Sequence, residues 1–89
     1  MEKFVVFGRY FEDAINKREP FRDLHLNRLK YLKDKNILVT LGPTKCPQYL
    51  FGIFNANDES QIRDLIEEDI YWEKGIWINY DIYPWIQAF

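Results

Sequence analysis

The sequence predicts an α+β fold of the ferredoxin-like type, a four-stranded antiparallel sheet with two helices on one face. Three observations predict it. Four short segments are rich in β-branched and aromatic residues, two longer segments space their apolar residues as helices do, and the elements follow the order βαββαβ. We expect a single domain, residues 1–89, because so short a chain has material for one core.

The first half of the chain is predicted to supply two strands and one helix. Residues 3–10 are rich in Phe, Val and Tyr and predict a strand. Residues 11–20 carry charges and end in a proline, so we expect a connection or an irregular turn there. Pro20 suits the first position of a helix that continues to about Lys35. The short apolar segment 37–41 is the second predicted strand, and a Gly-Pro pair follows it.

The second half of the chain is predicted to add two strands and the second helix. A loop precedes the third strand, residues 49–54. Asp58 then provides an N-cap for a helix over residues 59–68. Residues 76–83 alternate as a strand does, and a proline is expected to end them. The apolar tail, residues 85–89, is expected to pack on the domain or on a dimer partner.

The composition excludes several classes of function. Twelve Lys and Arg are interspersed with fourteen Asp and Glu, giving a net charge of −2, so nucleic acid is not an expected partner. No apolar run approaches the ~20 residues of a membrane span, and the first residues lack the features of a signal peptide, so we expect a cytoplasmic protein without a membrane partner. One cysteine, Cys46, and one histidine cannot build an internal disulfide or a structural zinc site, and no metal site is expected.

The predicted sheet is apolar on both faces. In the first strand Phe4 and Val6 point to one side and Val5 and Phe7 to the other, and residues 37–41 are apolar on both sides as well. Two helices can cover only one face, and a bare apolar face would aggregate. Packing against a second copy is the simplest cover, so the sequence predicts a homodimer.

One histidine and one aspartate stand out because both are predicted to point inward. On the first helix His25 lies near the middle of the predicted apolar arc, between Leu29 and Leu32. The arc is formed by Tyr31, Leu24, Phe21, Leu32 and Leu29. Asp69 follows Ile62 by seven residues and so continues the buried stripe of the second helix. Inward titratable groups need partners. We therefore expect the imidazole and the carboxylate to be partners of each other.

Three short patterns, taken together, resemble the YCII-related (YciI-like) family. This resemblance implies the dimeric α+β barrel fold that members of the family adopt, and it extends from about Lys3 to Trp85. The family usually has Asp-Pro-Tyr or Asp-Pro-Phe where this chain has Ile at the middle position, and the loop after the second strand is shorter than in many relatives. The patterns are Arg22-x-x-His25-Leu26-x-x-Leu29, Gly42-Pro43 and Asp69-Ile70-Tyr71-x-x-x-Gly75.

The resemblance also implies a function. It implies that the inward His–Asp pair is an active site, in a protein akin to muconolactone-isomerase-like proteins and to a dehydrochlorinase that acts on a chlorinated hydroxyaromatic. In that hypothesis Asp69 fixes the imidazole tautomer and His25 acts as general base and then as acid, without any cofactor. Arg22, Arg9 and Tyr71 are the candidate substrate-binding residues. A small hydroxyaromatic or keto acid is the expected substrate.

Other interpretations remain open at this stage. The pair could equally be a structural hydrogen bond that joins two helices, since buried polar groups find partners whether or not they catalyse. The protein could also be a ligand-binding or regulatory homodimer without turnover, because no third catalytic group is evident. Arg28, at the edge of the apolar arc, is expected to extend along it toward solvent. Trp77, Tyr83 and Trp85 are expected at the dimer face or the tail.

Overall fold

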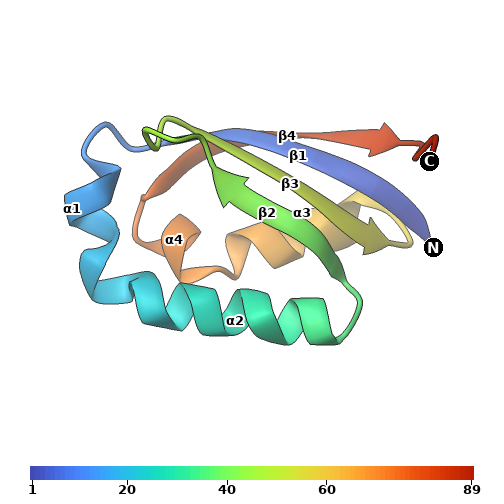
Figure 1. Ribbon diagram of the computed structural model, residues 1–89, viewed down its shortest axis with the longest axis horizontal. Coiled ribbons are helices and arrows are strands. Elements are labelled where there is room, and N and C mark those ends of the chain that lie inside the picture. The colour runs from blue at the N-terminus through green and yellow to red at the C-terminus, as the bar shows by residue number, and fades with distance from the viewer.

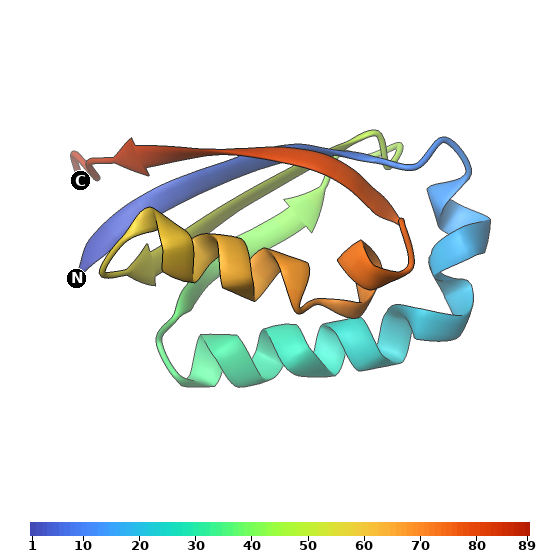
Figure 2. The ribbon, with the colours of Figure 1, turned by 180° about the vertical axis from the view of Figure 1, so that it is seen from behind.

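The computed structural model describes residues 1–89 as a four-stranded antiparallel sheet with all helices on one face (Figures 1 and 2). The strand order is β2-β3-β1-β4, with β1 and β3 in the centre. The predicted α+β, ferredoxin-like fold is confirmed. The strands are β1 (Glu2–Tyr10), β2 (Leu38–Pro43), β3 (Tyr49–Ala56) and β4 (Trp77–Trp85).

The helical layer has more pieces than the sequence predicted. Residues 11–20 are not only a connection, because α1 forms within them and the 3₁₀ turn η1 begins there. The two lead directly into α2, which lies under the sheet (Figure 2). A further short helix, α4, follows α3 and was not predicted. No helix of the structure has both the length and the apolar character that a membrane span requires. The bounds are α1 (Ala14–Arg18), η1 (Glu19–Phe21), α2 (Arg22–Asp34), α3 (Glu59–Glu67) and α4 (Ile70–Glu73).

Strand β4 is longer than predicted because its proline does not end it. Pro84 pairs with Phe4, and the strand continues to Trp85. β4 is an edge strand, where a residue without an N–H can face outward without losing a ladder hydrogen bond. Ile86 and Phe89 beyond it are exposed, so packing of the tail on a dimer partner stays a prediction.

Two irregularities in the sheet change which residues face the helices. The β1–β4 register shifts so that Arg9 pairs with Asn79 while Tyr10 pairs with Trp77, leaving Ile78 unpaired. Trp77 therefore faces the helices and is 2% exposed, so its predicted place at the dimer face or tail is wrong. A similar shift in β2 puts Leu38 and Leu41 on one face, although strict alternation would separate them.

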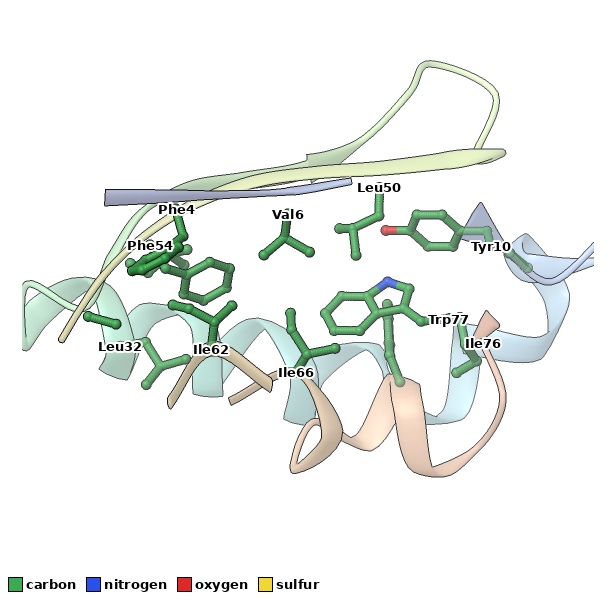
Figure 3. Packing of buried hydrophobic residues seen from close by; sticks show 14 residues of the cluster. Phe4, Val6, Tyr10, Leu32, Leu50, Phe54, Ile62, Ile66, Ile76 and Trp77 are labelled. Carbon is green, nitrogen blue, oxygen red and sulfur yellow. The ribbon is translucent and has the colours of Figure 1, made fainter. Parts of the chain in front are cut away.

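The core fills the space between the sheet and the helices α2 and α3 (Figure 3). From β1 the inward residues Phe4 and Val6 meet Ile62 and Ile66 of α3, whose spacing of four residues places both on one helix face. The opposite face of the sheet has no such cover within the chain. Its apolar side chains include Phe7, Phe51 and Tyr83, which are 43%, 45% and 55% exposed.

Candidate acid–base site

His25 lies in the first turns of α2 and is held between two aromatic rings. It is 4% exposed. Its ring stacks on that of Tyr71, with centroids 3.6 Å apart and planes inclined by 10°. The edge of Trp77 closes the site at 5.2 Å, with the planes at 86°. Because the register shift brings Trp77 inward, the sheet itself fixes the orientation of the imidazole.

Asp69 meets His25 as expected, but from a different local structure. Helix α3 ends at Glu67, so Asp69 does not continue its stripe as the sequence analysis assumed. It has extended backbone angles and is the N-cap of α4, where its Oδ1 accepts a hydrogen bond from the Tyr71 N–H at 2.9 Å. The same Oδ1 lies 2.8 Å from His25 Nδ1. The carboxylate is fully buried, so these contacts replace its hydration.

Arg28 completes the surroundings of the carboxylate. Its Nη1 donates to Asp69 Oδ2 at 3.1 Å, and its Nη2 donates to the Leu65 carbonyl at 2.9 Å. The prediction that Arg28 extends along the helix toward solvent is therefore wrong. Since a carboxylate beside a guanidinium acts only as an acceptor, we assign the hydrogen to His25 Nδ1 and the free lone pair to Nε2.

A small cavity of about 70 Å³ lies beside the imidazole, between the start of α2 and the end of β2. Of the predicted substrate-binding residues, Arg22 and Tyr71 line it together with His25. The remaining lining residues combine two polar groups with an apolar wall. They are Tyr10, Arg18, Leu26, Leu29, Leu41, Gly42 and Pro43.

Arg9 is not brought to this cavity. Its side chain leaves the opposite face of the sheet, where its Nη2 lies 3.5 Å from the Tyr49 hydroxyl and its guanidinium covers the Tyr49 ring. A larger hollow of about 480 Å³ adjoins Arg9 and the exposed Cys46 at the end of the sheet. It contains no imidazole, so the smaller cavity is the better candidate on chemical grounds.

Two tyrosines near the cavity remain protonated at neutral pH. Burial raises the pKa of Tyr10, and the indole of Trp77 offsets part of that effect. Burial likewise raises the pKa of Tyr71, and the charge of Arg18 offsets part of it. Both phenols are therefore hydrogen-bond donors rather than bases.

Sequence reasoning missed four of the residues that build the site: Tyr10, Arg18, Arg28 and Trp77. A usable signal existed for Arg18, because Arg18, Arg22 and His25 follow one another at spacings of four and three, which is a helical stripe. Interpreting residues 11–20 as a connection hid that stripe. Arg28 lies three residues after His25, so helical spacing also places it next to His25, on the C-terminal side.

Fold and site together define an α+β protein of the ferredoxin-like class with a buried His–Asp pair beside a cavity. The chain belongs to the YCII-related family, because the model of the YCII-related domain matches residues 2–86. The predicted resemblance is thereby confirmed. A comparison with curated proteins found no match.

A solved structure shares the fold at low sequence identity. It is a 5-chloro-2-hydroxyhydroquinone dehydrochlorinase from Burkholderia phenoliruptrix AC1100, in complex with 2,5-dihydroxybenzoquinone. The TM-score is 0.82 and the identity 19%, over 97% of this chain and 95% of that one. At this identity the likeness establishes the fold.

Proposed function

We propose that this protein is an acid–base enzyme that eliminates from or isomerises a small hydroxyaromatic or keto acid, with His25 and Asp69 as the catalytic pair. One observation carries the proposal. The imidazole lines the cavity and is bound through Nδ1 to a buried carboxylate 2.8 Å away, while its Nε2 has no hydrogen-bond partner in the chain. A structural pair has no need to border a cavity, whereas a base must reach its substrate.

The proposed chemistry moves one proton. Nε2 of His25 removes a proton from the carbon next to a carbonyl, and the electrons of the broken C–H bond form an enolate. Asp69 stabilises the imidazolium that results. Return of the proton at another carbon gives an isomer, whereas departure of a neighbouring group with its bonding electrons gives elimination. The name of the similar dehydrochlorinase describes such an elimination from a hydroxyaromatic, which supports this substrate class.

The test is proton exchange, which requires no knowledge of the product. The wild-type protein is incubated in deuterium oxide with a panel of small keto acids and hydroxyaromatics, and loss of carbon-bound protons is followed by NMR. We expect at least one compound to exchange about 10²-fold or more faster than in buffer alone. A compound that raises the melting temperature through binding without any faster exchange would contradict catalysis on that class.

The alternative is a ligand-binding homodimer without turnover. It is favoured by the small number of proton-transferring groups at the cavity, where His25 is accompanied only by tyrosines and arginines. Binding without exchange across the whole panel would support this alternative. Exchange by the wild-type protein would exclude it.

We further propose that the uncovered sheet face packs against a second copy, as the apolar side chains there suggest. Phe51 lies at the centre of this face, next to Phe7, and is 45% exposed. We expect the wild-type chain to sediment as a dimer at micromolar concentration and Phe51→Glu to sediment as a monomer, because a charge cannot be buried unpaired between two sheets.

Leu24→Glu is the matched control for the dimer. Leu24 is 63% exposed on α2, on the helical side of the molecule, so its substitution should leave the dimer intact. A wild-type chain that sediments as a compact monomer would contradict the proposed dimer.

A further inference from the structure

Two arginines at the cavity carry charge that the chain does not balance. Arg18 ends α1 and Arg22 begins α2, and both line the cavity beside His25. The three ion pairs of the chain involve His25, Arg28 and Arg63, and neither Arg18 nor Arg22 takes part in any of them. The Nε of Arg18 is shielded from solvent and has no hydrogen-bond partner. A buried guanidinium N–H without an acceptor is rare in folded proteins.

The residues that line the cavity add no negative charge to offset that of these arginines. The lining of the cavity contains no carboxylate. Asp69, behind the imidazole, is already matched by Arg28 at 3.1 Å. Tyr10 and Tyr71 are neutral donors, because burial raises the pKa of each. The cavity is thus a partly desolvated space with an excess of positive charge and of hydrogen-bond donors, which is suited to an anion.

The size and shape of the cavity limit which anion fits. A volume of about 70 Å³ is well below the roughly 300–1,000 Å³ of sites that enclose drug-sized ligands. Such a volume has room for one small planar group. Leu26 and Pro43 are exposed apolar residues of the lining, over which the rest of a ligand would lie. Guanidinium groups bind carboxylates through two parallel hydrogen bonds, a geometry that matches a planar acid.

We propose that Arg18 and Arg22 form a carboxylate subsite, which restricts the ligand of this cavity to small monocyclic or aliphatic acids bound as anions. This proposal rests on the proposed function in one respect, which is that the anion bound by the subsite is the substrate of His25. Arg18 is the specificity-determining residue, because its Nε gains in the complex the acceptor that it lacks in the free protein.

The single histidine provides the readout. The carbon-bound ring protons of His25 give one set of NMR signals, and benzoate and its uncharged analogue benzamide are titrated against them. We expect benzoate to shift these signals saturably and to bind about tenfold or more tightly than benzamide. Arg18→Gln and Arg22→Gln should each weaken benzoate binding by about tenfold or more and leave benzamide unchanged.

Controls separate the subsite from folding and from catalysis. Arg63→Gln removes an exposed arginine that pairs with Glu59, and it should leave benzoate binding unchanged. If Arg18→Gln does not fold, Arg18→Lys is the second variant. It keeps the positive charge but loses the paired N–H donors of the guanidinium, and it should weaken benzoate binding by a smaller factor. Equal affinity for benzoate and benzamide, or full affinity in the arginine variants, would overturn the subsite. Benzoate binding is measured without turnover, so a negative exchange assay would not contradict the subsite. A negative binding result would likewise not contradict catalysis by His25.

Discussion

Replacing Asp69 by alanine is expected to lower the free energy of unfolding by about 3–5 kcal/mol. Asp69 is fully buried and is the acceptor for the His25 ring, the Arg28 guanidinium and the Tyr71 N–H. Alanine leaves all three donors without an acceptor, and the half-buried guanidinium without its counter-charge. Small domains have only about 5–15 kcal/mol in total, so the loss is a large part of the stability. Urea denaturation measures it.

Asp64→Ala is the matched control for this loss. Asp64 lies on the neighbouring helix α3, is exposed and takes part in no ion pair, so its change should stay within about 0.5 kcal/mol. A loss below about 1 kcal/mol for Asp69→Ala would contradict the buried network, because an unmatched buried charge costs more than that.

The general architecture could be predicted because it depends on local patterns. Alternation in β1 is a property of a few neighbouring residues, and it predicts the observed faces. The apolar arc of α2 predicts the buried positions of His25 and Leu32. It also included Leu24 and Tyr31, which are 63% and 59% exposed, so that part of the arc is wrong. The inward direction of the His25 side chain was predicted from its position in the same arc. The exposed apolar face was also visible, because both sides of β1 are apolar.

The details of the site could not be predicted because they depend on partners far along the chain. Trp77 faces inward only because the β1–β4 register shifts by one residue, and no local pattern records such a shift. Asp69 was expected inward as part of a helical stripe, whereas it is inward as the cap of a four-residue helix. Arg28 pairs with a residue 41 positions away, so its role depends on where Asp69 lies.

Helix α1 shows the same limit. Its five residues are too few for a periodic pattern, and a helix of that length is not stable alone. It forms because the buried Ala14 anchors it at the end of the sheet, and this packing is what places Arg18 at the cavity. The spacing of Arg18, Arg22 and His25 was therefore present in the sequence, but no local pattern showed that the residues before Arg22 form a helix.

Replacing His25 by asparagine is expected to lower the rate of proton exchange by about 10²–10⁴-fold while the protein stays folded. The asparagine amide reaches the position of Nδ1 and can still donate to Asp69, so the buried carboxylate keeps a partner. In this variant no atom occupies the position of Nε2, so the proposed base is absent. The measurement is the exchange rate of the compound that the wild-type protein handles fastest, with circular dichroism as the check on folding.

Asn27→Ala is the control, because Asn27 is exposed and lies two positions along the same helix. This variant should catalyse the exchange at the wild-type rate. An undiminished rate in His25→Asn would move the base to another group on the cavity, and the remaining candidates are poor ones. Arginine does not give up its proton in proteins. Burial raises the pKa of both Tyr10 and Tyr71, which makes their phenolates still scarcer at neutral pH. Imidazole is the side chain suited to taking and returning a proton near neutrality, and the chain has one.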